Sequence, residues 1–292
     1  MSWFAFVMFG GLAVILVLYA RPPSPDGRRA RGTRLAQRYR MHIDSVDVPG
    51  FDEMLDRSRR RDGLTGALAA AVAGTVAIAL ELRPGNPPDF FPLVVVAIIM
   101  VAGAWIGALL GEIGQRLPDP HQPRAARSRS VAVGDFVHPF PRLCLGALSL
   151  AGLAIAIKAL VGPSTFGIIG TPALALAAAS VFVICELGAF ALVRLPQPAP
   201  ESTHLYVRDA LRSELMTHVY GTGLLNATLC LGLAMSGSGL YNLALAVLLL
   251  ISAAKTIVMI RPGLSHLRFR NRLWPDLSSD EIVTTTSAGT SA

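Results

Sequence analysis

The sequence has few charged residues and few aromatic ones. Only 15% of its 292 residues are Asp, Glu, Lys or Arg and 7% are Phe, Trp or Tyr, whereas 52% are hydrophobic. A soluble globular domain carries about 25% charged residues, so this composition excludes an ordinary soluble protein. Its apolar segments run for 18 to 23 residues, and a helix needs about 20 residues to cross a bilayer.

Lysine is nearly absent, because the 26 basic residues comprise 24 Arg and 2 Lys. Seven apolar segments predict transmembrane helices, since a helix satisfies its own backbone polar groups in lipid. If each segment crosses the bilayer, 23 of the 24 Arg lie on one side, with Arg83 as the exception. That side is predicted to be cytoplasmic. The segments are Trp3–Ala20, Leu64–Leu82, Phe91–Gly111, Leu143–Val161, Thr171–Val193, Val219–Ser236 and Gly239–Ile260.

The sequence therefore predicts an all-α, polytopic transmembrane helical bundle of seven spans in the cell membrane. The N-terminus is expected outside and the C-terminus in the cytoplasm. The first helix lies within residues 1–20, and a basic cytoplasmic segment covers residues 21–63. Six further helices occupy residues 64–260, and a cytoplasmic tail with a disordered end covers residues 261–292. No basic residue precedes the first helix, so we expect it to be retained rather than cleaved as a signal peptide.

Two of the predicted cytoplasmic segments have a distinctive pattern, one basic and the other amphipathic. Residues 21–63 open as a basic arm containing Pro and Gly and hold 11 of the 24 Arg, which favours contact with anionic lipid headgroups or with a cytoplasmic protein partner. Ser202–Tyr220 is amphipathic, and we expect it to form an interfacial elbow before the sixth span. Its apolar side comprises Leu205, Leu211, Leu215 and Val219, and its polar side comprises Arg208, Asp209, Arg212 and Glu214.

The sequence also contains signs of repeated helical hairpins. Two cytoplasmic connections begin alike, at Arg116-Leu117-Pro118 and at Arg194-Leu195-Pro196. The second and fourth predicted helices share a Gly-Ala-Leu start. This similarity favours an internal duplication of a hairpin, in which both copies enter from the cytoplasm.

Motifs for catalysis and for metal or cofactor binding are missing from the sequence. It contains no His-Glu-x-x-His, no P-loop and no Gly-x-Ser-x-Gly motif. The six His lie outside the predicted spans, and the three Cys lie within them without ligand spacing. We therefore expect no catalytic residue, metal or cofactor. The net charge of +7 comes from Arg that flank the spans without interleaved aromatic residues, which argues against nucleic acid as a partner.

Ionisable residues within the predicted spans are the candidate functional residues, because a charge in lipid is costly. Glu186 and Lys255 lie at similar depths, roughly 8–10 Å inside the cytoplasmic boundary at about 1.5 Å per residue. We predict that they form an ion pair or share a polar cavity, which either fixes the packing of two helices or couples the movement of a proton or substrate. Glu81 and Lys158 lie near the outer interface, where they either pair or extend to the headgroups.

Helix packing is predicted from small residues. Gly103, Gly107 and Gly111 form two successive Gly-xxx-Gly steps in the third span, and such a surface permits close approach of another helix. Packing within the bundle and formation of a homo-oligomer are both compatible with this pattern.

The preference for Arg over Lys and the helices rich in Ala, Gly, Leu and Val resemble proteins of high-GC bacteria. In layout, the chain resembles the uncharacterised multi-pass membrane proteins of actinobacteria that accompany ATP-driven transporters. The resemblance covers layout and composition, rests on no specific motif and transfers no residue roles.

The sequence therefore favours a non-enzymatic integral membrane component, which is either a transport-associated or a scaffold subunit with a basic cytoplasmic face. The alternative is a self-contained transporter of small solutes or ions that uses Glu186 and Lys255. An intramembrane enzyme acting on lipids is the third hypothesis.

Overall fold

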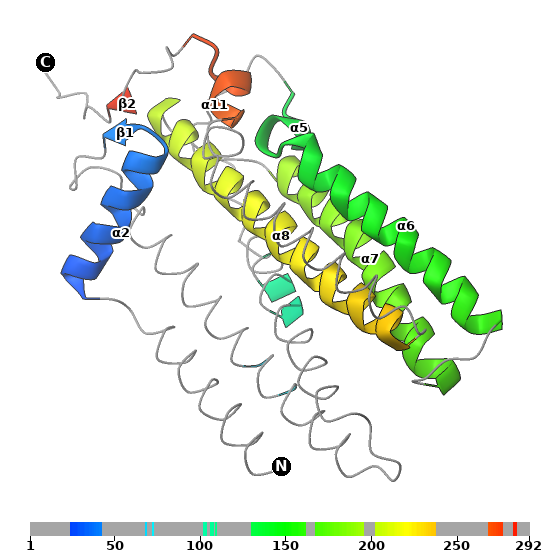
Figure 1. The fold of residues 1–292 in the computed structure, drawn as a ribbon. Coiled ribbons are helices and arrows are strands. Elements are labelled where there is room, and N and C mark those ends of the chain that lie inside the picture. Colours follow the sequence, from blue (N-terminus) through cyan, green and yellow to red (C-terminus); the bar gives the residue numbers. More distant parts are fainter. Residues whose placement is uncertain are drawn as a thin grey trace, which may run out of the picture.

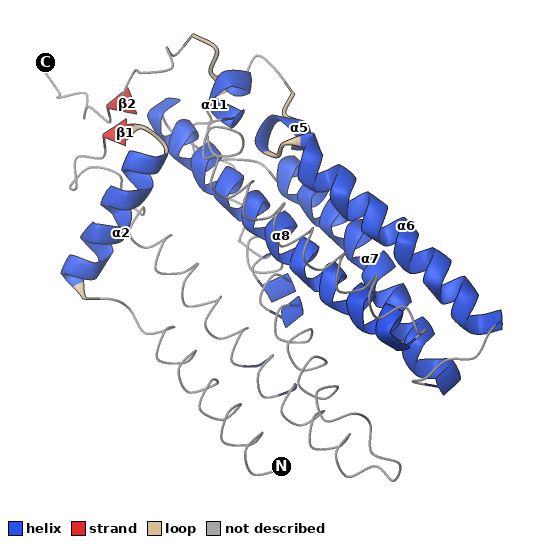
Figure 2. Cartoon of the chain, in the orientation of Figure 1, coloured by secondary structure: helices blue, strands red, loops and turns tan. Residues whose placement is uncertain are grey.

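The computed structural model describes residues 24–42, 130–161, 167–195, 202–237, 268–276 and 283–284. It also describes the isolated helical residues Leu68, Val72, Ala102, Gly103, Ile106, Gly107 and Leu109. These parts of the chain are helical apart from one pair of two-residue strands, so the all-α prediction holds for them (Figure 2).

Three long helices lie side by side and form the core of the described structure (Figure 1). They are α6 (Pro139–Val161), α7 (Gly167–Arg194) and α8 (Ser202–Gly237). Two of them, α6 and α7, are long and apolar enough to cross a membrane. Their outward faces expose large apolar side chains such as Leu150, which is 70% exposed, and Leu187, which is 62% exposed. An apolar outer surface of this kind is typical of a face that contacts lipid or another protein.

The predicted fourth and fifth spans agree with α6 and α7 in position, but the helices are longer. The first, α6, begins four residues before the predicted Leu143. The second, α7, begins at Gly167 and contains Pro172, so the end of the predicted outer turn belongs to the helix. Pro172 lies only five residues after the start of α7, and proline is least disruptive near a helix N-terminus.

The amphipathic segment and the sixth predicted span form one continuous helix rather than a helix and an elbow. α8 has 36 residues, which gives it a length of about 54 Å at about 1.5 Å per residue. The predicted polar side of this segment was also wrong in part, because Asp209 is completely buried. The elbow was predicted from the amphipathic pattern, which does not show that residues distant in sequence, such as Trp274 for Asp209 and Arg38 for Glu214, contact the polar side.

The remaining described elements gather at the end of the bundle where α8 begins (Figure 1). They are α2 (Pro25–Arg38), β1 (Met41–His42), α5 (Val133–Phe136), α11 (Arg268–Leu273) and β2 (Val283–Thr284). β1 and β2 pair in parallel, with Met41 opposite Val283 and His42 opposite Thr284. These two residues of the C-terminal tail therefore lie in a strand, and the disorder of the end of the tail stays a prediction.

Helix α2 lies within the basic arm, for which no helix was predicted. Its N-terminus has ordinary helix-start residues: the Ser24 hydroxyl accepts a hydrogen bond from the Gly27 backbone N–H at 3.2 Å. Pro25 occupies the first helical position, and Asp26 lies in the first turn. Each of these residues favours a helix start. The sequence therefore contained a recognisable N-terminus for α2, but the segment was interpreted from its many Arg as a basic arm.

Small residues allow α6 and α7 to approach closely. A Cβ atom on Gly152 would lie 2.7 Å from the Ala175 carbonyl oxygen and 3.2 Å from the Ala179 backbone nitrogen. Three residues earlier on the same helix, the Ser149 hydroxyl donates a hydrogen bond to the Ala179 carbonyl oxygen at 2.7 Å. Close backbone contact together with a hydroxyl donor is the usual way in which helices associate in lipid.

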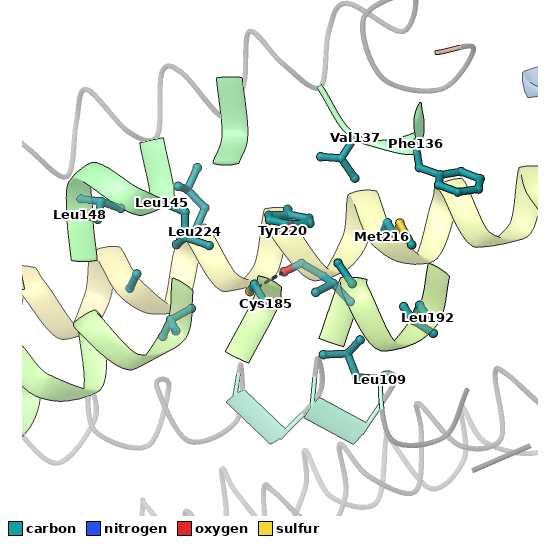
Figure 3. Close-up of a cluster of buried hydrophobic side chains, with 14 of the residues drawn as sticks. Leu109, Phe136, Val137, Leu145, Leu148, Cys185, Leu192, Met216, Tyr220 and Leu224 are labelled. Carbon is teal, nitrogen blue, oxygen red and sulfur yellow. Dashed lines mark hydrogen bonds between the residues drawn. The ribbon is translucent and has the colours of Figure 1, made fainter. Parts of the chain in front are cut away.

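The contact continues from α7 to its neighbours. A Cβ on Gly223 of α8 would lie 2.6 Å from Cys185 Sγ, and one on Gly188 would lie 2.8 Å from Leu109 Cδ1. Leu109 belongs to the predicted third span, so that segment also contacts α7. Figure 3 shows the buried apolar cluster around Tyr220, in which Leu145 and Leu224 lie on one side and Phe136 and Met216 on the other.

We predict that Gly152→Ala destabilises the protein by about 1–3 kcal/mol, because the new methyl group meets backbone atoms that cannot rotate away. Gly146→Ala is the matched control on the same helix, since its Cβ would meet only Phe182 at an ordinary 3.8 Å. This control is expected to be neutral or slightly stabilising. Thermal unfolding in detergent measures both variants, and equal stability of the two would contradict the described contact between α6 and α7.

Candidate functional site

One charged cluster links all three helices of the core. The Arg142 guanidinium of α6 donates two hydrogen bonds to the Glu186 carboxylate of α7, from Nε to Oε1 at 2.8 Å and from Nη2 to Oε2 at 2.7 Å. The Tyr220 hydroxyl of α8 donates a third hydrogen bond to Glu186 Oε1 at 2.9 Å. We call these residues the Arg142–Glu186–Tyr220 triad.

The position of Arg142 explains why it needs an acidic partner. Arg142 is the fourth residue of α6, so its charge lies near the positive end of the helix dipole, where a cation is unfavourable. A bidentate carboxylate offsets that repulsion and satisfies the planar guanidinium. At the same helix start, His138 Nδ1 accepts a hydrogen bond from the Phe140 backbone N–H at 3.2 Å.

Burial sets the strength of the triad. The side chains of Arg142 and Glu186 are 34% and 24% exposed, so the pair is neither a solvated surface contact nor a dry interior one. Three donated hydrogen bonds satisfy most of the lone pairs of the carboxylate. The triad therefore holds Glu186 as an anion and joins α6, α7 and α8 at one point.

The predicted partner of Glu186, Lys255, lies outside the described residues, so their pairing stays a prediction. Arg142 and Tyr220 were missed as partners for a definite reason. Arg142 immediately precedes the predicted fourth span and was attributed to topology, and Tyr220 ended the predicted elbow. A long guanidinium side chain at a span boundary can extend inward to a carboxylate about two turns deeper. The position of Arg142 at such a boundary could therefore have identified it as a partner of Glu186.

The other predicted site residues do not join the triad. Lys158 is exposed in the last turn of α6, and Glu81 lies outside the described residues. Gly103 and Gly107 are helical, with Gly107 buried, and Gly111 is not described. Among the described residues, no group of three or more His, Cys, Asp or Glu is placed to hold a metal ion.

A second buried cluster lies at the end of the bundle where α8 begins. Its four rings come from three parts of the chain and form what we call the aromatic node: Tyr39, Tyr206, Phe269 and Trp274. The ring centroid of Phe269 lies 5.9 Å from that of Tyr39 and 5.3 Å from that of Tyr206. The centroids of Tyr206 and Trp274 are 5.5 Å apart. Such offset and edge contacts are favourable beyond the buried area alone.

Hydrogen bonds fix the node to α8. The Tyr206 hydroxyl donates to the Tyr39 carbonyl oxygen at 2.9 Å, and the Trp274 indole Nε1 donates to Asp209 Oδ2 at 3.0 Å. Arg270, only 1% exposed, donates from Nη1 to the Tyr206 hydroxyl oxygen at 3.4 Å. The residue after Tyr39, Arg40, has a left-handed φ of 52°, which turns the chain from α2 into β1.

Helix α11, which carries Phe269 of the node, also contacts α5. Arg268 of α11 donates from Nε to the Gly134 carbonyl oxygen of α5 at 2.8 Å. Asp135 Oδ2 accepts from the Ala132 backbone N–H at 2.9 Å and so closes the α5 turn. Segments near both ends of the chain are therefore held against α8 and α5.

Burial raises the pKa of the Tyr39 phenol above its ordinary value of 10.0, and the nearby Glu214 carboxylate raises it further while Arg38 lowers it. Burial is also the main cause of the raised pKa of Tyr206. Both phenols are thus held in their neutral form.

No protein-family model matches this chain, and no curated protein and no solved structure is significantly similar to it. The triad and the aromatic node are therefore the features from which a function can be inferred.

We predict that charge reversal at either end of the ion pair, by Arg142→Glu or Glu186→Arg, destabilises the protein by about 1–3 kcal/mol, because each leaves two like charges in a half-buried position. The double reversal should recover part of this loss, since the pair is restored with opposite polarity. Unfolding in detergent measures the cycle. Additive losses in the double variant would show that the two side chains do not interact.

We predict that the aromatic node weakens above pH 10. The folded-state pKa of Tyr39 is raised, so its contribution to stability is complete below the unfolded-state pKa near 10 and is lost as the pH rises toward the folded-state value. Tyr39→Phe should reduce this alkaline loss. Melting temperatures in detergent from pH 8 to 11 test the prediction, and an identical pH dependence in the two proteins would contradict it.

Proposed function

We propose that the chain is a seven-span, multi-pass protein of the cell membrane that acts as a transport-associated or scaffold subunit without enzymatic activity. In this proposal, the end of the bundle that carries the aromatic node is cytoplasmic. The node, α2, α5, α11 and the β1–β2 pair form a docking module for a cytoplasmic partner.

The observation that carries the proposal is the continuity of α8. One helix of 36 residues packs against α6 and α7 along the bundle and also supplies Tyr206 and Asp209 to the node. A helix of about 54 Å exceeds the roughly 30 Å of hydrocarbon in a bilayer. A partner bound to the module would therefore be rigidly connected to the membrane bundle, as a scaffold requires.

The triad also favours a structural role over ion coupling. A coupling carboxylate must change its protonation or partner during a transport cycle, whereas Glu186 accepts two hydrogen bonds from Arg142 and one from Tyr220. Removing one partner of such a pair is costly. The transporter alternative, which requires Glu186 together with Lys255, thus has less support than the scaffold.

The chemistry of the partner follows from charge. The chain carries a net charge of +7, and most of its Arg belong to the side that we propose to be cytoplasmic. An acidic surface on a cytoplasmic protein would be attracted to that face, and the attraction would weaken with salt. By resemblance in layout, we propose that this partner is the ATP-hydrolysing subunit of a transporter.

The test is purification of the tagged full-length protein from its native membranes in mild detergent. We expect an ATP-hydrolysing protein to co-purify in stoichiometric amount at low salt and to dissociate at high salt. Phe269→Ala, which removes a fully buried ring of the node, should reduce its recovery at least about tenfold, because detachment of α11 costs several kcal/mol.

The matched control is Lys158→Gln, an exposed charge at the opposite end of α6, which should leave the recovery unchanged. Recovery of the chain alone at both salt concentrations would contradict the subunit proposal. Solute or proton flux by the purified protein in vesicles, abolished by Glu186→Gln, would favour the transporter instead.

A further inference from the structure

Two hydroxyl groups on α8 are buried without a partner among the described residues. They are Ser213 Oγ and Thr217 Oγ1, both of which are inaccessible to solvent. Ser213 as a whole is completely buried. A buried hydroxyl that makes no hydrogen bond costs about 1–3 kcal/mol, so two such groups in adjacent turns require an explanation.

Two other hydroxyls of the same helix bond to the backbone of the helix. Thr222 Oγ1 donates to the His218 carbonyl oxygen at 2.7 Å, and Thr228 Oγ1 donates to the Leu224 carbonyl oxygen at 2.7 Å. This bond to the carbonyl four residues earlier is the usual solution for Ser and Thr within a helix. Ser213 and Thr217 do not adopt it, so neither hydroxyl satisfies its donor within the described structure.

The two hydroxyls belong to a polar stripe along α8. Asp209, Ser213, Thr217 and Tyr220 follow one another at intervals of four, four and three residues, so they lie on one face of the helix. The stripe begins at Asp209, which accepts from Trp274 in the aromatic node. It ends at Tyr220, which donates to Glu186 in the triad.

We propose that the stripe holds a file of buried water molecules that runs from Asp209 to the triad. A buried water makes about three hydrogen bonds to polar groups that are otherwise unsatisfied. The Ser213 and Thr217 hydroxyls each offer one donor and two acceptor sites. The file gives Glu186 contact with the aqueous phase at the node end of the bundle.

Met216 provides a readout in the unaltered protein. It lies between Ser213 and Thr217 in sequence and is completely buried. X-ray radiolysis converts bound water to hydroxyl radicals, which oxidise a neighbouring Met thioether. Met235 is the control, because it is only 4% exposed on the same helix but lies far from the stripe. We expect Met216 to be oxidised at least about fivefold faster than Met235, since ordered water persists at such sites.

The Ser213→Ala/Thr217→Val variant removes both hydroxyls at little change in volume. It should reduce the oxidation rate of Met216 to that of Met235 while leaving Met235 unchanged. Equal rates for the two methionines in the unaltered protein would overturn the proposal, and so would a rate at Met216 that the double variant does not change.

Cysteine reactivity tests the same file from the aqueous side. In a background with Cys144, Cys185 and Cys230 replaced by Ala, Ser213→Cys and Thr217→Cys should react with a small, charged thiosulfonate at least about tenfold faster than Ala210→Cys. Ala210 is completely buried on the same helix and at the same end, and only a hydrated thiol ionises and reacts readily. Reaction of all three at one rate would overturn the proposal. This inference is independent of the proposed scaffold function, whose failure would appear in the purification instead.

Discussion

The bond between Arg142 and Glu186, completed by Tyr220, is the interaction on which the described core depends. Each of the three long helices contributes one residue to it. Apolar side chains alone specify the packing of helices in lipid poorly, because lipid tails are as apolar as the side chains themselves. A directed, charge-assisted contact restricts the rotation and the depth of each helix. The same arrangement contains the close approaches of neighbouring helices at Gly152 and Gly223.

The length of α8 extends this constraint beyond the apolar core. The helix that is held by the triad through Tyr220 carries Tyr206 and Asp209 into the aromatic node. A displacement of the node would therefore be transmitted along one continuous helix to the point where α6, α7 and α8 meet. The polar stripe lies on the same stretch of α8. The node and the triad are therefore connected both by a continuous helix and by a row of polar side chains.

Part of this arrangement could be predicted from the sequence. The apolar segments predicted α6 and α7 to within a few residues, because runs of Leu, Ala and Val have one stable form in lipid. Glu186 was selected as a candidate because it is a charge within an apolar segment, and it does lie in the triad. The partners Arg142 and Tyr220 were not found, since a residue at the predicted edge of a span was attributed to orientation or to an elbow. Helix α2 has a recognisable start at Ser24, Pro25 and Asp26. No helix was predicted there, because the segment was interpreted as a basic arm from its many Arg.

By itself, the sequence determined the composition and the positions of α6 and α7, because the apolarity of a segment depends on its own residues; the sorting of Arg to one side of seven spans stays a prediction. Only the tertiary structure decided that Ser202–Gly237 is one helix, that Asp209 is buried, and that Tyr39, Tyr206, Phe269 and Trp274 meet. Those features depend on contacts between residues up to more than 200 positions apart in the chain. A local pattern of charge and hydropathy contains no information about which distant side chain covers a polar group.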